Sequence, residues 1–291
     1  MLLTKWDIDK RYLKLDIKKG DEDLSILSSL GVDAKISFNT TESVSGAVNE
    51  ANIVINGILP EKMAYLSTSS TQWIKEAIQN RIIIDAGYEQ KGHGVIFDGV
   101  ITDATPQLEN ANYSITIKAL NSFGDMLNSI KSYSFEGDVP ASEIANKFAV
   151  DLKFVFLNSL SKDVIVSNYS LKDKSIIDHI RYLSQITGLD VYTTHNRLFI
   201  KERGKTVNDY SELVLDYHNI VGTPVPTSQG FNVNIRLNPF VLTGQSVKIN
   251  SQRFDTLNSE NFVLQSMSHV GDTRGSWITR CVLFRKDLLN G

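Results

Sequence analysis

Apolar and polar residues alternate with a period of two through much of the first third of the chain. Every second residue is apolar in four segments: 12–18, 34–39, 51–57 and 113–120. Such alternation is typical of strands that bury one face. The polar segment 39–50 between two of them predicts a loop or an exposed strand end. The pattern therefore predicts a β-rich unit at the start of the chain.

One helix is expected within this unit. Residues 69–80 place four apolar side chains on one helical face and polar side chains opposite. Ser69 and Gln72 have the spacing of a capping box at its start. Strands resume at residue 81, with glycines between them, so we expect a single helix packed on a sheet or closed barrel.

The middle of the chain has a helical period. Pro140 suits the first turn of a helix that continues to about residue 152. A second helix is predicted within residues 172–188, with Gly188 as its C-terminal stop. The apolar stripe of that second helix consists of Ile176, Ile177, Ile180, Leu183 and Ile186. A hairpin turning at His195 and Asn196 follows.

The last part of the chain returns to strands. Five candidates are separated by Gly, Asn, Pro and Ser turns: 213–217, 231–237, 246–252, 261–270 and 276–284. We predict a mainly β fold with a small α+β insert. The expected divisions are a first β domain with one helix at 1–131, the insert at 132–204, and a second β domain at 205–291.

Composition changes this picture little. The chain has 291 residues with 42% hydrophobic and 22% charged side chains, which is ordinary for a folded protein. No apolar run approaches the length of a membrane span, and the start lacks a signal-peptide core, so we expect folding in the cytoplasm. The net charge of −3 is spread along the chain and supplies no basic stripe for binding nucleic acid.

Candidate chemistry is sparse. Cys281 is the only cysteine, and its place in an alternating segment predicts a small packed residue. His93, between glycines, is favoured as a turn residue, and His179 as a residue at the edge of a helix face. No histidine has a partner at metal-ligand spacing, so no metal and no cofactor are predicted.

Three further patterns carry no clear chemistry. Residues 204–206 end like a phosphate-binding loop, but the motif's earlier glycine is missing, since Phe199 stands there. The acidic cluster Asp21, Glu22 and Asp23 is favoured as a solvated turn. Carboxylate pairs for glycan hydrolysis are defined by distance in space, so the sequence leaves that enzyme class open.

The order of short motifs resembles one protein family. In the first half, a strand ends in Gly87 and Tyr88, and a glycine-bearing loop leads to Phe97 and Gly99. In the last block, an Asn-Pro turn is followed by two glycine-bearing segments; its motif positions are Asn238, Pro239, Gly244, Gly271, Asp272 and Trp277. With the intervening helical segments, the whole chain resembles the baseplate hub proteins of phage tails, the tail-tube-like hubs that join tail tube and central spike.

The resemblance implies two tail-tube-like β-barrel or sandwich domains flanking the insert. It further implies a homotrimer, a ring with pseudo-sixfold symmetry that joins the sixfold tail tube protein to the threefold central spike protein and leaves a channel for DNA in transit. Other implied partners are baseplate wedge proteins and the tape-measure protein. The expected place is the virion, after assembly in the host cytoplasm, without catalysis. The alternatives are a tail-associated cell-wall lysin and a tail-tube or terminator subunit.

Overall fold

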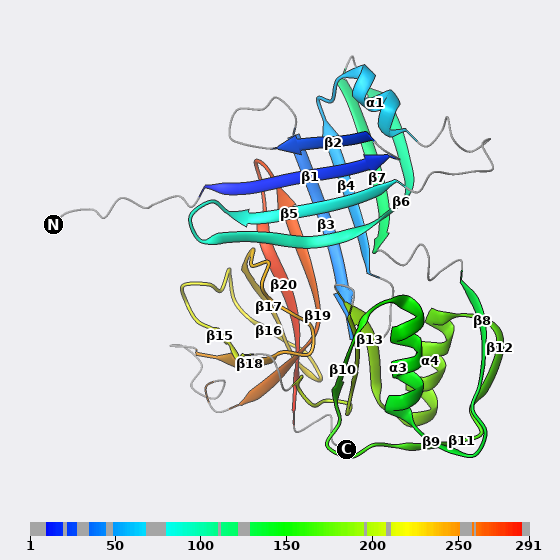
Figure 1. Ribbon diagram of the computed structural model, residues 1–291. Helices are drawn as coiled ribbons and strands as arrows, with labels where there is room; N and C mark the ends of the chain where they lie inside the picture. Colours follow the sequence, from blue (N-terminus) through cyan, green and yellow to red (C-terminus); the bar gives the residue numbers. More distant parts are fainter. Residues whose placement is uncertain are drawn as a thin grey trace.

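The computed structural model is mainly β, with few helices. The residues that it describes are 10–19, 22–27, 35–44, 49–67, 80–109, 112–121, 129–194, 197–207, 211–250, 258 and 260–286. Within these ranges, no helix is long and apolar enough to cross a membrane. Figure 1 shows long strands crossing one another at one end of the molecule and a compact helical part at the other.

A 13-stranded sheet joins the two ends of the chain. Its order is β16 (Val225–Pro226), β17 (Gly230–Arg236), β20 (Trp277–Arg285), β19 (Asn261–Asp272), β3 (Lys35–Ser43), β4 (Glu50–Asn56), β7 (Asn112–Asn121), β6 (Gly92–Glu109), β5 (Arg81–Tyr88), β1 (Arg11–Lys19) and β2 (Glu22–Leu27). The strands β15 (Leu213–Leu215) and β18 (Ser246–Ile249) attach through β19. All neighbours along the main order are antiparallel. The pairing of β3 with β19 makes the first and last β units parts of one sheet.

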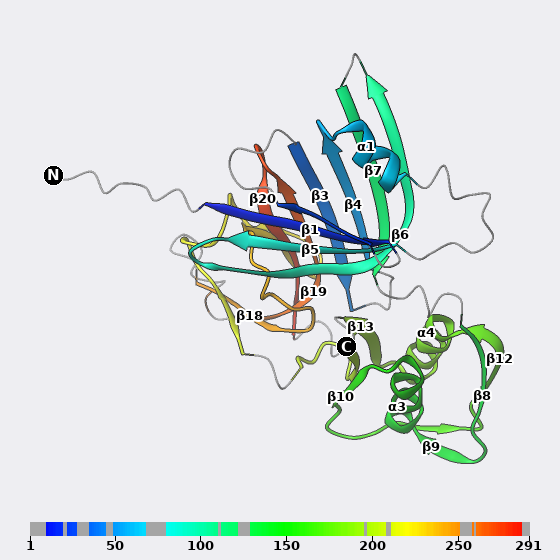
Figure 2. The ribbon, with the colours of Figure 1, turned by 45° about the horizontal axis from the view of Figure 1, so that its top comes forward.

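Strand β6 belongs to two layers. Its first half pairs with β5 as far as Val100, and its second half pairs with β7. Gly99 lies at the corner, where an added Cβ would collide with the Leu120 carbonyl and the Phe97 ring. A register shift between Ile101 and Asp103 follows, as expected where a bulge bends a strand. As a result β1 and β5 cross over β3, β4 and β7 (Figures 1 and 2).

The space between the crossing layers holds the first hydrophobic core. Alternate residues of β1, β3, β4, β5 and β7 fill it, which confirms the period-two prediction for β1, β3, β4 and β7. A second core lies under β17, β18, β19 and β20 and includes Cys281. The five strands predicted after Lys205 are therefore confirmed: β15 and β18 are shorter than predicted, β17 and β20 are shifted by one residue, and β19 extends to Asp272. The division into domains at the predicted boundaries stays a prediction.

The insert has a separate core between two helices and a small sheet. Helices α3 (Ala141–Leu152) and α4 (Ile176–Thr187) pack on the three-stranded sheet β10 (Val155–Ser159), β14 (Arg197–Lys201) and β13 (Asp190–Thr194). Two small ribbons complete it: β8 (Ile130–Ser134) with β12 (Ser170–Ser175), and β9 (Asp138–Pro140) with β11 (Ile165–Ser167). This part lies beside the ends of the long strands (Figures 1 and 2).

Both predicted helices of the insert are confirmed, but residues 172–175 of the second belong to β12, and α4 begins at Ile176. Gly188 ends α4 with a φ of 70°, and its N–H donates to the Ser184 carbonyl, as in a left-handed C-cap. Ser175 caps the start by accepting from the Asp178 N–H. Pro140 precedes α3 as its N-cap instead of occupying its first turn. Ile186 of the predicted stripe is 44% exposed, so the buried face is narrower than predicted.

Three local elements differ from the predictions or lie outside the described residues. A short helix, α1 (Pro60–Leu66), was not predicted, because seven residues are too few to show a helical period. The predicted helix from Ser69, with its Gln72 capping box, falls almost wholly outside the described residues. Glu22 and Asp23 begin β2 instead of a solvated turn; Asp21 is not described. Within residues 39–50, for which a loop or an exposed strand end is predicted, β3 continues to Ser43, in agreement with a strand end.

Candidate functional site

Motif residues from both ends of the sequence meet around Trp277. The Trp277 Nε1–H donates to the Gly87 carbonyl at 3.1 Å. Its ring packs edge-on against Phe38, with ring centroids 5.5 Å apart. Gly271 leaves room for this pair, since an added Cβ would overlap the Phe38 ring. Both aromatic side chains are buried, so this contact holds β3, β5 and β20 together.

Charged groups surround the same contact. Arg11 donates from Nη1 to the Asp272 carbonyl at 2.8 Å, and its guanidinium lies 5.5 Å from the centre of the Trp277 ring. The Asp272 carboxylate pairs with Lys35 at 3.1 Å. We call Arg11, Phe38, Gly87, Gly271, Asp272 and Trp277 the Trp277 junction. It joins the first strands of the chain to the last two.

Asp272 is held in its charged form at this junction. Partial burial acts to raise its pKa, but the Arg274 N–H, the Lys35 ammonium and the Gly275 N–H outweigh that effect. The pKa of Asp272 therefore lies below its ordinary value. The neighbouring Thr273 N–H donates to the Ile36 carbonyl at 3.0 Å, so the loop after β19 is fixed to β3.

The Asn-Pro turn forms a second contact between the β units. Asn238 donates its N–H to Thr279 Oγ1 and accepts the Phe240 N–H, both at 3.0 Å. Pro239 and Phe240 lie over the β5–β6 hairpin, where an added Cβ on Gly94 would be 3.6 Å from Pro239 Cβ. Because the glycines of the hairpin have no side chains, the Asn-Pro turn packs directly against the hairpin backbone. This packing is a structural role that requires no reactive group.

Gly244 lies at a third contact, between the last β unit and the insert. Its φ is 82°, and an added Cβ would be 2.5 Å from the Tyr192 hydroxyl, so both backbone and space favour glycine. Tyr192 donates to the Thr243 carbonyl at 3.3 Å. A small hydrophobic cluster here joins the insert to the end of β3; its buried members are Val44, Tyr192, Phe199 and Val207.

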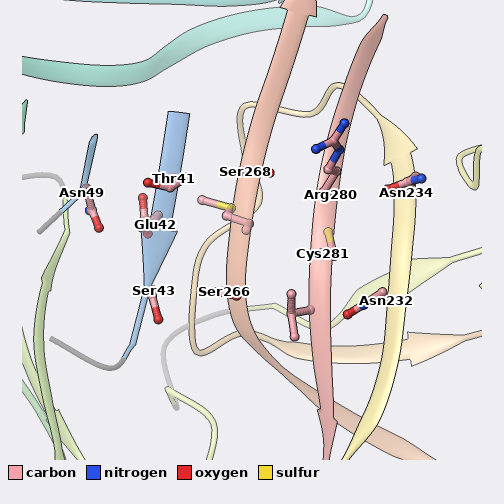
Figure 3. A pocket seen from close by; sticks show the side chains of 12 residues that line it. Thr41, Glu42, Ser43, Asn49, Asn232, Asn234, Ser266, Ser268, Arg280 and Cys281 are labelled. Atoms are coloured by element: carbon pink, nitrogen blue, oxygen red, sulfur yellow. The ribbon is translucent and has the colours of Figure 1, made fainter. Parts of the chain in front are cut away.

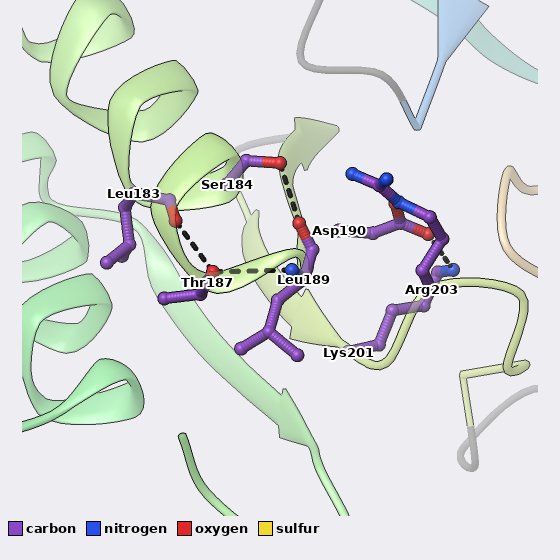
Figure 4. A network of polar contacts seen from close by, with 7 residues as sticks. All are labelled: Leu183, Ser184, Thr187, Leu189, Asp190, Lys201 and Arg203. Carbon is purple, nitrogen blue, oxygen red and sulfur yellow. Dashed lines mark hydrogen bonds and ion pairs between the residues drawn. The ribbon is translucent and has the colours of Figure 1, made fainter. Parts of the chain in front are cut away.

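A buried ion pair lies at the same end of the insert. Lys201 Nζ is 2.6 Å from Asp190 Oδ2, and the Lys201 side chain is fully buried. Burial lowers the pKa of Lys201 below its ordinary value, although Asp190 opposes that effect. Arg203 approaches the other carboxylate oxygen at 3.7 Å (Figure 4). Because removing one partner would leave a buried charge unpaired, this pair fixes the local arrangement.

The motif positions predicted from sequence thus fall into separate places. Gly87, Gly271, Asp272 and Trp277 come together at the Trp277 junction. Asn238 and Pro239 lie at the second contact, and Gly244 at the third. Tyr88 ends β5, while Phe97 and Gly99 lie at the corner of β6. Their functional role stays a prediction. The junction residues Arg11 and Phe38, and Lys35 that pairs with Asp272, were missed, because no local pattern links them to residues near position 272.

One face of the long sheet is polar and has no described layer over it. We call β17, β20, β19, β3, β4, β7 and the second half of β6 the seven-strand layer. The side chains on its inner face fill the first and second hydrophobic cores, and those on its outer face are mainly Asn, Ser and Thr. A hollow of about 630 Å³ lies on this outer face (Figure 3), with a smaller one of about 240 Å³ nearby. The polar residues that line the larger hollow include Thr41, Ser43, Asn49, Asn232, Ser268 and Arg280.

A few reactive side chains lie at the hollows: Cys281 lines the larger one, and Glu42, Asp98 and His269 line the smaller one. The His269 Nδ1 atom is 2.9 Å from Thr279 Oγ1. Cys281 is 1% exposed, and burial raises its pKa to about 12, so its thiolate is strongly disfavoured. His179 is buried in the insert instead of lying at an edge, with Nδ1 3.0 Å from the Tyr169 hydroxyl and Nε2 3.1 Å from the Lys131 carbonyl. His93 lies in β6, stacked on Tyr12 and paired with Asp85. Across the described ranges, no group of three His, Cys, Asp or Glu side chains is placed to hold a metal.

The fold matches solved structures of phage tail proteins along nearly the whole chain. The 43 kDa tail protein of prophage MuSo2 from Shewanella oneidensis has a TM-score of 0.64 and 11% identity, covering 95% of this chain and 99% of that one. A tail protein from Neisseria meningitidis MC58 has a TM-score of 0.61 and 10% identity, covering 95% and 97%. At these identities the likeness shows the fold alone.

A third match comes from a secretion system. An Escherichia coli component of the type VI secretion system, described as structurally similar to the bacteriophage T4 tail proteins gp27 and gp5, has a TM-score of 0.59 and 9% identity. The match covers 92% of this chain and 76% of that one. The fold is therefore shared with solved tail proteins and with a component of a secretion system.

The sequence identifies the family. The family model for baseplate hub gp41 matches residues 13–275. The chain belongs to the baseplate hub gp41 family, and is thus a phage tail component. Among curated proteins, none matches the sequence. The predicted fold class and family are confirmed.

Proposed function

We propose that three copies of this chain form the hub ring of a phage baseplate, with a pseudo-sixfold outline. The ring joins a sixfold tail tube on one side to a threefold central spike on the other, and DNA passes through its centre. Membership of the hub family supports the proposal. The structural observation that carries it is the seven-strand layer, to which both β units contribute strands.

The outer face of the seven-strand layer suits the wall of that channel. Its exposed side chains are mostly short, uncharged and polar, such as Asn39, Asn52 and Asn232. The charges on it are of both signs: Lys118 lies opposite Asp103, and Arg280 lies between Asn234 and Ser268. Clustered basic side chains hold a DNA duplex because their contacts with phosphates release counterions. This wall has no such cluster among its described residues, so it makes few lasting phosphate contacts and DNA slides past it.

The contacts around the cores suit a rigid adaptor. The Trp277 junction holds the two β units in one orientation, and the cluster at Gly244 holds the insert against them. Each β unit then presents a fixed surface, and a ring of three chains has six such surfaces. On this proposal the tail tube meets one rim, the spike the other, and wedge and tape-measure proteins meet the remaining surfaces. The chain itself performs no catalysis.

Electron microscopy of the purified protein, alone and mixed with its spike and tube proteins, tests the proposal. Class averages should show three-chain rings with a near-sixfold outline. Rings of six chains would instead indicate a tail-tube or terminator subunit. Absence of any ring in the presence of both partners would overturn the hub proposal. Lysis of cell-wall material in a zymogram, abolished by one acidic substitution, would overturn the non-catalytic part.

A further inference from the structure

A small crevice lies at one end of the first hydrophobic core. It is the smaller hollow described above, with a volume of about 240 Å³, and it lies between the first half of β6 and the strands β3 and β19. The strand β6 contributes Val95, Ile96 and Phe97 to its lining. The strands β3 and β19 contribute Thr40 and His269, which are buried cross-strand neighbours. The crevice therefore combines an apolar lining from one strand with a polar lining from two others.

Two oxygen-bearing side chains at this crevice have acceptor capacity to spare. Asn49 is 5% exposed, and its Oδ1 atom accepts no hydrogen bond within the described part of the chain. Glu42 accepts a hydrogen bond from Thr243 Oγ1 at 2.8 Å and forms no ion pair with a described residue. Both side chains line the crevice and also the larger hollow, so the two hollows meet beside them (Figure 3). Because a buried acceptor without a donor is costly, this place favours a ligand that supplies N–H groups and positive charge.

The other carboxylate at the crevice is already neutralised. Asp98 contributes to the lining, but both of its carboxylate oxygens accept hydrogen bonds from the Arg81 guanidinium. The charge that is left without a cation is that of Glu42. Calcium ions need many oxygen ligands and magnesium ions keep several waters, and the described residues contain no acidic or histidine group of three that could hold a metal. One negative charge beside an apolar lining instead fits a singly charged organic cation.

We propose that the crevice binds a primary alkylammonium group, the chemistry shared by a lysine side chain and a free diamine. The ammonium group has three N–H donors, which Asn49 Oδ1 and the Glu42 carboxylate accept. Its methylene stem lies along the apolar residues of β6 and enters past Val95, which is 41% exposed. Pockets for drug-sized ligands measure about 300–1,000 Å³, so a crevice of about 240 Å³ fits one such chain. The site lies within a single chain and does not depend on the ring proposed above.

Nuclear magnetic resonance of the purified protein during titration with butylamine tests the site. We expect saturable shifts in the amide signals of Asn49, Thr40 and Phe97. Butanol has the same stem without the charge and should shift these signals only weakly. E42Q keeps the shape of the side chain and should weaken butylamine binding about tenfold or more, because charge-assisted hydrogen bonds are the strong ones. E50Q, at the exposed first residue of β4, is the matched control and should bind butylamine as the unaltered protein does.

A second variant tests the entrance of the crevice. V95W places a large side chain at an exposed position, so the protein should fold and lose the butylamine shifts. Equal affinity in E42Q and E50Q, equal shifts from the alcohol and the amine, or full binding by V95W would overturn the site. Formation or absence of rings has no bearing on these results, so the hub proposal stands or falls separately.

The source of the alkylammonium group can be identified on assembled tails. A carbodiimide joins a carboxylate to an amine in contact with it, and mass spectrometry then identifies what is linked to Glu42. A link to a lysine of a second copy or of another tail protein would assign the site to a protein partner. A link to added putrescine would assign it to a free diamine. A Glu42 that stays unlinked in tails, and also in the purified protein with butylamine, would overturn the proposal.

Discussion

The insert and the Trp277 junction are both well packed, but they differ in how far apart along the chain the contacting residues lie. In the insert, Tyr169 and His179 are separated by 10 residues and Lys201 and Asp190 by 11. At the junction, Trp277 bonds to Gly87 across 190 residues, and Arg11 reaches Asp272 across 261. Contacts between residues close in the sequence leave a recognisable pattern in that sequence. Contacts between residues far apart in the sequence hold the long sheet together but leave no such pattern.

The largest expected effect comes from removing the junction tryptophan. W277A empties a buried site and breaks the bond to Gly87, so we expect a loss of about 3–5 kcal/mol in the free energy of unfolding. Urea denaturation measures the loss. Hydrogen exchange should show faster opening of β3, β5 and β20, with protection of α3 and α4 retained. Equal loss of protection in the insert would show that the two regions do not unfold separately.

Y217A is the matched control for this truncation. Tyr217 is 63% exposed, so its removal should change the free energy of unfolding by less than about 0.5 kcal/mol. A similar loss in Y217A and W277A would contradict a special role for the junction.

A smaller effect is expected from filling space at the junction. G271A places a methyl group into the Phe38 ring, and we expect a loss of about 1–3 kcal/mol by overpacking. G94A is the control, since its added Cβ meets Phe240 and Pro239 only at 3.5 Å and 3.6 Å, ordinary contact distances. Thermal unfolding of the two variants compares them. A G94A protein as unstable as G271A would argue against a tight junction.

In the insert, a glycine-to-alanine change at the end of α4 strains the backbone without creating a steric overlap. G188A forces alanine into the left-handed region at the end of α4, with no atom within 4 Å of the added Cβ. The expected loss is about 1 kcal/mol. Exchange rates in the last turn of α4 should rise while those of β19 and β20 stay unchanged. Q185A, on the exposed side of the same helix, should leave both sets of rates unchanged.

The smallest effect concerns pH. Burial lowers the pKa of His179 below its ordinary value, which is about 6.5. Because the folded-state pKa is depressed, its contribution to stability is present above pH 6.5 and is lost as the pH falls through the folded-state value. Exchange in α4 should therefore accelerate at mildly acidic pH, before β19 and β20 are affected. A protein with H179N should show less of this pH dependence, and an unchanged profile would rule out His179 as its cause.

Much of the fold could be predicted from the sequence because its elements are periodic. Leu13, Leu15 and Ile17 identified β1, and the stripe ending at Gly188 identified α4. The strand β2 was missed because its first residues, Glu22 and Asp23, are charged and resemble a turn. The helix α1 was too short to show a period. In both cases the tertiary neighbours, and not the local residues, decide the conformation.

The contacts among the cores could not be predicted in the same way. The sequence motifs included Gly271 and Trp277 as positions in a family pattern, with no physical reason attached. The reason is Phe38, which lies far away in the sequence and packs against both. Likewise Gly244 requires Tyr192 to explain it. Alternation assigns residues to faces of strands, but it contains no information about which strands are neighbours.

The pairing of β3 with β19 has a consequence for how the protein is made. The ribosome completes β19 roughly 230 residues after β3, which takes on the order of 10–50 s at bacterial rates of synthesis. During that time the edge of β3 has no partner from its own chain, and such edges pair with other chains. Nascent chains therefore pass through an aggregation-prone stage that ends only when the last two strands emerge.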